Sequence, residues 1–318
     1  MSILITGMNG QDGRILSEYF KGIGENVFGI ARDQVAYPLG NTQQVESVKI
    51  DSAASFNEFL DFAKPKSIFH LAASHANSIE MKKHGEKAKT EMFSVHVEAT
   101  RIILDWQSQN LKLKTKLVVA LSSQMFTANT NLTWIDESTS LSPSTQYGQT
   151  KALAYELIRE YRSKYDVYAT GAILFNHSSR FSKPDFVLIE IARQIIDVLS
   201  GKSNQIVLRD FNSEMDISDA ESICKALVRM LSLEKPEDFV LASGSPTNLR
   251  KLTLDCLKWY KVTREIELIS SNPSRKPLKT LVGNSKKASS MLNWNPIQDP
   301  VTLLVSIVDN LMELSSND

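Results

Sequence analysis

A short polar run follows one of the most apolar stretches of the chain, "KLVVALSSQMF" at residues 116–126. The stretch predicts a buried strand that ends in two hydroxyls and an amide, those of Ser122, Ser123 and Gln124. Hydroxyls at a strand end can hydrogen-bond a reacting oxygen, whereas an amide can orient a polar group but can neither give nor take a proton. The strand end therefore predicts a catalytic site that needs a proton carrier other than Gln124.

A candidate proton carrier lies in "STQYGQTKALAYELIREY", where Tyr147 and Lys151 are four residues apart at the start of a predicted helix. That spacing places both side chains on one helix face. An ammonium beside a phenol favours the tyrosinate, so Tyr147 could remove a hydroxyl proton while hydride leaves the same carbon, with Ser122 bonded to the same oxygen. The motif is weak alone, because a chain with eight tyrosines shows it by chance in roughly half of cases.

A cofactor that could take the hydride is indicated near the N-terminus. The run "SILIT" predicts a strand, and "GMNGQDG" follows it with Gly7, Gly10 and Gly13 just before a helical pattern. Glycines let a pyrophosphate approach the backbone, and the helix N-terminus offers unpaired N–H groups. A glycine turn with no ligand is the alternative, but the order of strand, loop and helix favours a dinucleotide site.

The residues after the second predicted strand bear on which dinucleotide binds. An acidic residue there usually holds the ribose of NAD, whereas an arginine favours the extra phosphate of NADP. Arg32 and Asp33 are adjacent and Arg32 is nearer the strand, so NADP is slightly favoured over NAD. Asp51 could meet the adenine, and Ala72 with Ala73 would let the cofactor lie close to the chain. A turn carboxylate and two packing residues are equally compatible with the pattern.

The elements that must position these residues alternate along the chain. Strands are predicted near 2–6, 26–31, 47–50, 67–72, 116–122 and 168–174, and helices near 13–21, 54–63, 87–109 and 147–165. This order predicts an α/β fold with a Rossmann-type doubly wound parallel sheet. Past Asn176 we expect helices near 185–199, 218–232, 249–260 and 302–314, and strands near 205–209 and 238–242. The predicted domains are a dinucleotide-binding domain at 1–175 and a smaller α/β C-terminal lobe at 176–318 that mainly binds substrate.

Composition narrows the class of protein. The 318 residues include 36 Lys plus Arg and 36 Asp plus Glu, so no net charge would attract nucleic acid or an anionic membrane. The two cysteines form no metal-binding motif, and no metal is expected. No apolar run approaches the roughly 18 residues of a spanning helix, and the first strand leaves no room for a signal peptide. These features predict a soluble, cytoplasmic protein.

With the glycine loop, the strand-end serine and the Tyr/Lys pair in this order, the chain resembles the extended short-chain dehydrogenase/reductases of the NAD-dependent epimerase/dehydratase family. Within that family it is most similar to the GDP-mannose 4,6-dehydratases. The segments that carry the resemblance span nearly the whole length: "ILITGMNGQDGRIL", "SSQMF", "SPSTQYGQTKALAYELIREYRSKYDVYATGAILFNHSSR", "PEDFVLASG" and "LVGNSKKASSMLNWNP".

The resemblance implies hydride transfer at C4 of a hexose linked to a nucleotide, most plausibly GDP, with NADP or NAD as cofactor and a homodimer or homotetramer as the assembly. Tyr147 would be the base, Lys151 would lower its pKa and bind the nicotinamide ribose, Ser122 would hydrogen-bond the same oxygen, and Gln124 occupies a further catalytic position. The other implied cofactor positions are Gly7, Asn9, Gly10, Gln11, Asp12, Gly13, Arg32, Asp51, Leu71, Ala72, Ala73 and Leu174. The implied substrate positions are Ser74, His75, Ser123 and Asn176, and Arg209 or Arg275 is expected to compensate for substrate-binding arginines of the family that this chain lacks.

Gln124 departs from the family and changes the expected reaction. The dehydratases carry a glutamate there, which removes the C5 proton and helps expel the C6 hydroxyl as water. Loss of a general base commonly costs about 10²–10⁴ in rate, so C4 oxidation or reduction is favoured over dehydration. Met215 replaces a family arginine, and residues 276–279 replace an Arg-Pro-x-Glu clasp for the nucleotide, which indicates an altered substrate pocket.

Three functions follow as hypotheses. The first is an oxidoreductase acting at C4 of a nucleotide sugar. The second is a 4,6-dehydratase or epimerase in which another group, such as His96 or His75, replaces the glutamate; His96, which stands where relatives carry an asparagine, could relay protons or only pack. The third is a cofactor-binding regulatory subunit without turnover, which the intact Tyr147 and Lys151 argue against. His177 is expected to be structural rather than catalytic.

Overall fold

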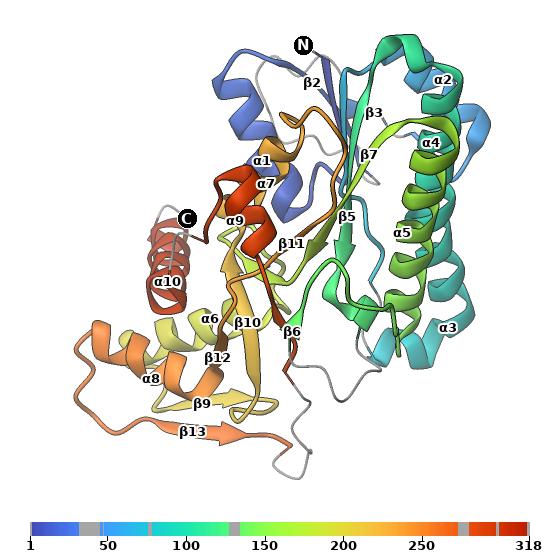
Figure 1. Cartoon of the computed structure of the whole chain (residues 1–318). Helices are drawn as coiled ribbons and strands as arrows, with labels where there is room; N and C mark the ends of the chain where they lie inside the picture. The colour runs from blue at the N-terminus through green and yellow to red at the C-terminus, as the bar shows by residue number, and fades with distance from the viewer. Residues whose placement is uncertain are drawn as a thin grey trace.

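A seven-stranded parallel sheet forms the centre of the fold (Figure 1). The computed structural model describes residues 2–31, 45–46, 48–75, 78–126, 134–272, 280–296 and 299–316. The sheet has the order β11-β7-β5-β4-β1-β2-β3. Its strands are β1 (Ser2–Thr6), β2 (Asn26–Ile30), β3 (Val45–Glu46), β4 (Ser67–His70), β5 (Lys116–Ser122), β7 (Tyr168–Leu174) and β11 (Phe239–Leu241). The predicted α/β fold with a doubly wound sheet is confirmed, and the strand order reverses between β1 and β4, where such sheets bind ligands.

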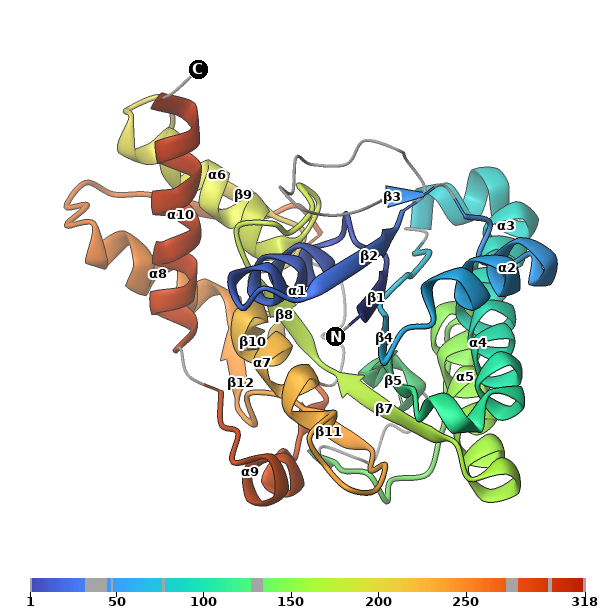
Figure 2. The same ribbon diagram turned by 90° about the horizontal axis from the view of Figure 1, so that it is seen from above.

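Alternate residues of β5 face opposite sides of this sheet, and each side has its own apolar core. Leu117, Val119 and Leu121 pack in one buried cluster, whereas Val118 and Ala120 pack in another. Helices α2 (Ala53–Ala63), α4 (Ala99–Gln109) and α5 (Gln146–Tyr165) cover the first side. Helices α1 (Gln11–Gly22), α7 (Ala220–Met230) and α9 (Lys286–Leu292) cover the second, as the view in Figure 2 shows. The sheet is thus buried on both faces, which accounts for its continuous apolar strands.

The helix expected at 87–109 differs from the prediction. It begins earlier, as α3 (Ser78–Phe93), and a π-helical turn at Ser94–Glu98 separates α3 from α4. Such turns insert one extra residue and often occur at functional sites. Here the turn carries the buried His96 toward the active-site edge of the sheet.

A second group of elements, called the small lobe below, packs around its own core. It contains α6 (Val187–Leu199), α8 (Leu249–Trp259) and α10 (Pro300–Ser316), with strands β8 (Asn176–Ser178), β9 (Gln205–Leu208), β10 (Glu214–Asp219), β12 (Pro246–Asn248) and β13 (Glu267–Ser270). Strand β10 pairs with β8 and β12, and β9 pairs with β13. A two-stranded pairing of β6 (Trp134–Ile135) with β14 (Val282–Gly283) completes the sheets.

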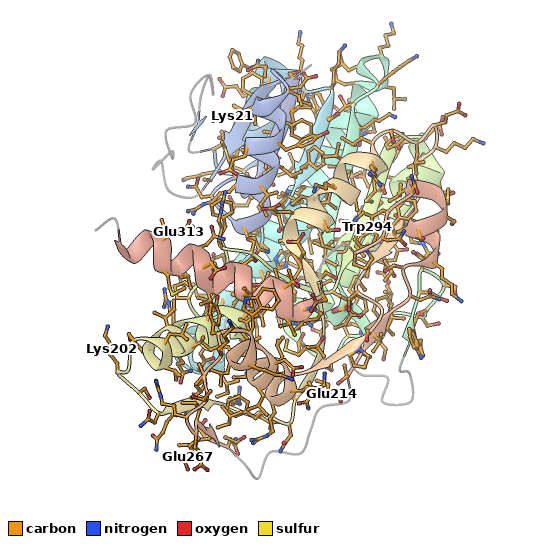
Figure 3. All side chains as sticks on the ribbon, turned by 90° about the vertical axis from the view of Figure 1, so that its left-hand side faces the viewer. Lys21, Lys202, Glu214, Glu267, Trp294 and Glu313 are labelled. Atoms are coloured by element: carbon orange, nitrogen blue, oxygen red, sulfur yellow. The ribbon has the colours of Figure 1, made fainter. Side chains whose placement is uncertain are left out.

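Several elements beyond residue 175 return to the large sheet. Strand β11 pairs with β7, and α7 and α9 lie on the sheet face that α1 covers. Trp294, labelled in Figure 3, is buried in the same cluster, and its indole Nε1 donates to the Ser222 carbonyl oxygen at 2.8 Å. The C-terminal part of the chain therefore builds both the small lobe and one flank of the large sheet.

Other sequence-based boundaries also need correction. Residues 48–50 are not a strand, and the third strand of the sheet is instead β3. The helix expected at 218–232 begins at Ala220, because β10 extends to Asp219 and the Asp219 carboxylate accepts hydrogen bonds from the first N–H groups of α7. Strands β6, β8, β10, β12, β13 and β14 and helix α9 were not predicted. No helix in the part of the chain that the structure describes has the length and apolar character needed to cross a membrane.

Candidate active site

The candidate catalytic residues meet where β5 ends and α5 begins. Ser122 is the last residue of β5, and Tyr147 is the second residue of α5. The Ser122 side chain hydrogen-bonds the Tyr147 hydroxyl. Ser122 Oγ also accepts a hydrogen bond from the backbone N–H of Gln124 at 3.2 Å. The structure thus brings together the serine and tyrosine that the sequence motifs indicate.

Lys151 lies one helical turn after Tyr147 and is only 3% exposed. Its Nζ donates to the Ala120 carbonyl oxygen at 2.7 Å and lies 5.8 Å from the centre of the Tyr147 ring. Burial lowers the pKa of Lys151 to about 7. Burial and the Asp12 charge raise the pKa of Tyr147 to about 12, although the Ser122 hydrogen bond acts in the opposite direction. Burial of the phenol therefore sets the direction of the shift, and a lowering of the Tyr147 pKa by Lys151 stays a prediction.

Gln124 is tied to the start of the catalytic helix. Its Oε1 accepts a hydrogen bond from Thr145 Oγ1 at 3.1 Å, and Thr145 Oγ1 accepts from the Gly148 N–H at 3.0 Å as the N-cap of α5. A Cβ at Gly148 would lie 2.3 Å from the Gln124 carbonyl oxygen, so only glycine permits this close approach. Gln124 is therefore held beside the Ser122–Tyr147 pair.

His96 supports Tyr147 from the π-helical turn. Its Nε2 accepts from the Ser74 backbone N–H at 3.2 Å, and its Nδ1 lies 2.8 Å from Thr150 Oγ1, which itself donates to the Tyr147 carbonyl oxygen at 3.0 Å. The Thr150 hydroxyl uses its proton in that bond, so Nδ1 of His96 must donate to the Thr150 oxygen. The imidazole therefore carries its single proton on Nδ1, is neutral, and has a hydrogen bond at both nitrogens. Burial and the Lys151 charge lower the pKa of His96 further. This geometry assigns His96 a positioning role and leaves no nitrogen for proton relay.

The end of β4 is fixed by a second neutral histidine. Nε2 of His70 faces the Val95 carbonyl oxygen at 3.2 Å, so it donates, and Nδ1 accepts from Thr6 Oγ1 at 2.7 Å. Thr6 Oγ1 in turn accepts from the Ala72 N–H at 3.3 Å. Burial and Lys151 lower the pKa of His70 to about 3. The bonds join the ends of β1 and β4 to the π-helical turn.

The glycine loop has the geometry that a dinucleotide requires. Gly7 has φ +74°, and a Cβ there would lie 2.8 Å from the Ala72 backbone. A Cβ at Gly13 would lie 2.5 Å from the Gly7 carbonyl oxygen. Gly10 is the N-cap of α1 and has no side chain to occupy the first N–H groups of that helix. The glycine loop, Ala72 and the N-terminus of α1 therefore fit a cofactor diphosphate.

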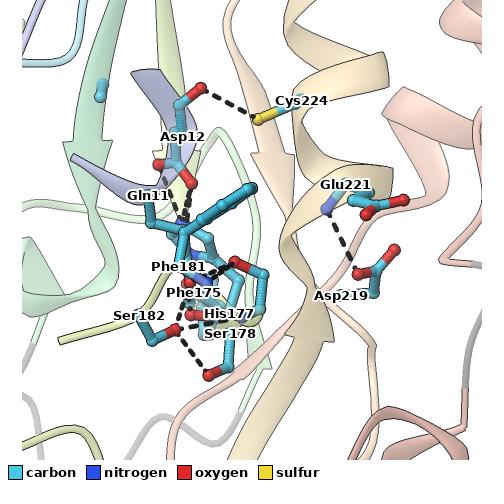
Figure 4. Close-up of polar contacts among 12 residues, drawn as sticks. Gln11, Asp12, Phe175, His177, Ser178, Phe181, Ser182, Asp219, Glu221 and Cys224 are labelled. Carbon is cyan, nitrogen blue, oxygen red and sulfur yellow. Dashed lines mark hydrogen bonds and ion pairs between the residues drawn. The ribbon is translucent and has the colours of Figure 1, made fainter. Parts of the chain in front are cut away.

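The two residues that follow Gly10 contact the segment after β7. Gln11 bonds the hydroxyls of Ser179 and Ser182, and Asp12 pairs with His177, whose Nε2 lies 3.0 Å from Asp12 Oδ2 (Figure 4). The predicted cofactor positions Gln11 and Asp12 thus lie at a junction with the strand that carries Asn176.

The remaining predicted positions spread over the same edge and beyond it. Ser74 is buried under His96, and the exposed His75 packs its ring 5.2 Å from that of Tyr147. Asn176 is exposed and its Nδ2 donates to the Asp216 carbonyl oxygen at 3.2 Å. The other positions lie in loops or at strand ends: Asn9 in the glycine loop, Asp51 in an exposed turn before α2, Leu71 and Ala73 after β4, Ser123 after β5, Leu174 at the end of β7 and an exposed Arg209 after β9. Arg32, Asp33, Arg275 and residues 276–279 lie outside the described residues.

Three supporting residues were not found from the sequence. Thr145 could have been recognised as a helix N-cap, and Thr150 lies inside the Tyr147–Lys151 motif. Asp216 on β10 accepts hydrogen bonds from the N–H groups of Ser243, Gly244 and Gly283. Nothing in the local sequence marks this carboxylate, because its partners are distant in the sequence, in the loop after β11 and in β14.

The doubly wound sheet, the glycine loop and the Ser122, Tyr147 and Lys151 group are typical of NAD(P)-dependent oxidoreductases. The sequence profile of the family described as GDP-mannose 4,6 dehydratase matches residues 4–303. The chain therefore belongs to that family, as the resemblance of its motifs predicts.

Individual relatives agree with this assignment. The chain is 27% identical to the GDP-mannose 4,6 dehydratase of Dictyostelium discoideum, over 92% of this chain and 90% of the relative. It is 27% identical to GDP-mannose 4,6 dehydratase 1 of Arabidopsis thaliana, over 99% and 91%. Each match extends over nearly the full length of both proteins.

Solved structures of low sequence identity share the fold. RMD from Pseudomonas aeruginosa, complexed with NADPH, superimposes with a TM-score of 0.78 at 18% identity and covers 98% of this chain and 99% of its own. The dTDP-glucose 4,6-dehydratase of Bacillus anthracis, in complex with NAD, gives 0.79 at 16% identity, covering 99% and 98%. These similarities support the fold alone.

Proposed function

We propose that the chain transfers hydride between NAD(P) and C4 of a GDP-linked sugar without carrying the reaction on to loss of water. The observation that carries the proposal is the Ser122–Tyr147 hydrogen bond above a buried Lys151, combined with Gln124 at the end of the same strand. NAD(P), when bound, supplies or accepts the hydride. The names of the relatives support a GDP-linked hexose as the substrate.

Tyr147 exchanges a proton with the sugar O4, giving it during reduction of a 4-keto sugar and taking it during oxidation of the alcohol. Ser122 hydrogen-bonds the same oxygen and fixes its position. Because burial raises the pKa of Tyr147 to about 12, the phenol stays protonated across the neutral range. At neutral pH Tyr147 is therefore in the form that donates a proton to O4 when a 4-keto sugar is reduced.

Gln124 determines where the reaction stops. Its amide can hydrogen-bond a sugar hydroxyl but cannot remove the C5 proton or protonate the C6 hydroxyl. The hydrogen bond from Thr145 helps to hold Gln124 next to Ser122, where the sugar would bind. Chemistry that needs only Tyr147 remains available, and chemistry that needs a second acid or base does not.

The positions for cofactor and substrate follow the layout of the sheet edge. Gly7, Gly10 and Gly13 would hold the cofactor diphosphate, and Arg32 favours NADP over NAD. Asn176 would meet the substrate diphosphate, and Ser74, His75 and Ser123 lie nearer to Tyr147. The small lobe would mainly bind the nucleotide sugar, in a homodimer or homotetramer.

The direct test incubates the purified protein with NADPH and a GDP-4-keto-6-deoxyhexose, or with NADP and a GDP-hexose, and follows the nicotinamide absorbance. We expect a change that Tyr147→Phe abolishes. No change with any nucleotide sugar, under conditions where the cofactor binds, would refute the proposal. Binding of NAD(P) without any response to nucleotide sugars would instead support a regulatory subunit.

The second candidate function is dehydration, with another residue acting as the base in place of the family glutamate. It is favoured by His75, which is exposed and packs against the Tyr147 ring. His96 is unsuited to this role because both its nitrogens are occupied. If His75 replaces the glutamate, the product from GDP-mannose is a 4-keto-6-deoxy sugar visible by NMR, and His75→Ala abolishes it while C4 oxidation remains.

A further inference from the structure

His177 joins two parts of the chain that are far apart in sequence. Its Nδ1 lies 2.8 Å from the Phe175 carbonyl oxygen, and its Nε2 lies 3.2 and 3.0 Å from the two carboxylate oxygens of Asp12 (Figure 4). Asp12 belongs to the first turn of α1, whereas His177 lies in β8 next to Asn176. One side chain therefore spans the glycine-loop helix and the strand proposed to meet the substrate.

The hydrogen bonds themselves determine the charge of this histidine. A carbonyl oxygen and a carboxylate can only accept, so both ring nitrogens must donate, and a neutral imidazole has only one N–H. Asp12 Oδ1 also accepts from Gln11 Nε2 at 3.1 Å, and the pKa of Asp12 lies below its ordinary value because of His177 and Gln11, so Asp12 is a carboxylate at neutral pH. His177 and Asp12 are thus an imidazolium and a carboxylate.

The surrounding groups agree with this charge state. Burial alone would lower the pKa of His177, but Asp12, the Phe175 carbonyl and Asp219 raise it to about 9. Burial alone would raise the pKa of Asp12, but His177 and Gln11 bring it below its ordinary value. On the α7 side, the neutral thiol of Cys224 donates to the Asp12 carbonyl oxygen at 3.7 Å.

Gln11 forms a second connection between the same two segments. Its Oε1 accepts from the Ser179 hydroxyl at 3.1 Å and from the Ser182 hydroxyl, and its Nε2 donates to the His177 carbonyl oxygen at 3.4 Å. Only one orientation of the amide satisfies these partners together with the Asp12 carboxylate. The start of α1 is thereby fixed to residues 177–182 at several points.

The ion pair lies close to the place where an anionic diphosphate would bind, so its charge state should affect binding. Asp12 lies two residues after the Gly10 N-cap, where an anionic diphosphate would bind, and an uncompensated carboxylate there would repel it. We propose that His177 is a positioning residue that cancels the Asp12 charge and fixes the glycine-loop helix to the Asn176 strand, so that cofactor and nucleotide sugar bind cooperatively. The identity of the two ligands rests on the proposed function.

The test measures binding, with NADPH and GDP-mannose as probes, and needs no turnover. We expect His177→Gln to weaken NADPH binding by about fivefold or more at neutral pH, and to remove most of the increase in affinity that GDP-mannose gives. His177→Lys, which restores a cation, should recover part of the affinity. Lys251→Gln, which removes the cation of an exposed ion pair with Asp255 on α8, serves as the matched control and should change neither value.

A double-mutant cycle measures how much of the effect on NADPH binding comes from the interaction between His177 and Asp12. His177→Gln should cost much less in an Asp12→Asn background than in the natural chain, because no carboxylate then needs compensation. Equal costs in both backgrounds, or an unchanged NADPH affinity in a folded His177→Gln variant, would overturn the proposal.

The pH dependence of the natural protein provides a measurement that does not depend on a variant folding. NADPH binding should weaken as pH rises through about 9, when His177 loses its proton and the Asp12 charge is exposed. An affinity that is constant from pH 7 to 10 would overturn the proposal. Coupled binding without any turnover would refute the proposed function and leave this inference standing.

Discussion

Thr145 Oγ1 donates a 3.1 Å hydrogen bond to Gln124 Oε1, and the same oxygen caps the helix that carries Tyr147. The bond joins the turn after β5 to the start of α5. A glutamate could accept the same bond with one carboxylate oxygen, so the local architecture does not demand an amide. What the amide changes is the proton chemistry available beside Tyr147.

Thr145→Val removes both this bond and the N-cap of α5. We expect the free energy of unfolding to fall by about 1 kcal/mol, and kcat to fall by about tenfold because Tyr147 and Gln124 lose their shared support. Chemical denaturation and steady-state kinetics measure the two effects. Asn248→Ala, which removes the N-cap of α8 in the small lobe, is the control: it should cost similar stability and leave kcat unchanged. Equal loss of kcat in both variants would show that lost stability, rather than position, is the cause.

Lys151→Met should separate stability from activity. The pKa of Lys151 falls from its ordinary 10.5 to about 7 in the folded protein, so the unfolded chain holds this proton more tightly. The cost of burying Lys151 is therefore full below about pH 7 and disappears as pH rises toward 10.5.

At pH 6.5 we expect Lys151→Met to raise the free energy of unfolding by about 1–3 kcal/mol, and this gain to shrink at pH 10. Turnover should fall by at least about 10². Denaturation at the two pH values measures the gain, and the exposed Lys251→Met is the control. A gain that is independent of pH would contradict the lowered pKa of Lys151.

Tyr147 should give the two directions of the reaction different pH dependences. Since its pKa is raised to about 12, the fraction of tyrosinate, and with it kcat/KM for alcohol oxidation, should rise with pH from 7 to 10. Reduction of the keto sugar should be nearly constant over this interval, because the phenol remains protonated. Tyr147→Phe should abolish both. If the reduction rate instead falls with a midpoint near pH 7, deprotonation of Lys151 and not of Tyr147 determines the pH dependence.

His96→Leu distinguishes positioning from proton relay. The substitution leaves the Ser74 N–H without its acceptor and removes the bond from His96 Nδ1 to the Thr150 oxygen, so we expect a loss of about 1–3 kcal/mol in the free energy of unfolding. The pH profile of kcat/KM should keep its shape, because burial lowers the pKa of His96 and the ring does not titrate in the neutral range. Loss of one limb of that profile would show that His96 carries a proton.

Local patterns were enough to predict the parts of the molecule that depend on short-range rules. The glycine loop, the end of β5 and the Tyr147–Lys151 spacing each follow from the geometry of one strand or helix. The parts that sequence reasoning missed depend on distant partners. The strand "NHS" has no apolar residue, and "EMDISD" has only the alternating Met215 and Ile217, so both signals are short; the strands form because β8 and β10 pair with each other.

The charge states of the site residues also could not be predicted from local sequence. His177 and Asp12 are 165 residues apart in the sequence, and no local motif predicts that they pair. The raised pKa of Tyr147 likewise depends on how deeply the folded protein buries the phenol. The spacing of Tyr147 and Lys151 predicted that the two side chains lie close together, but local spacing cannot predict how far burial raises the pKa of the phenol.

The most direct test of the account is the identity of the product formed from GDP-mannose and NADP, determined by NMR for the natural protein and for Gln124→Glu. We expect the natural protein to give only C4 redox products, and Gln124→Glu, which restores a proton carrier, to form a measurable 4-keto-6-deoxy sugar. A 4-keto-6-deoxy sugar from the natural protein, at a rate comparable to that of Gln124→Glu, would contradict the account.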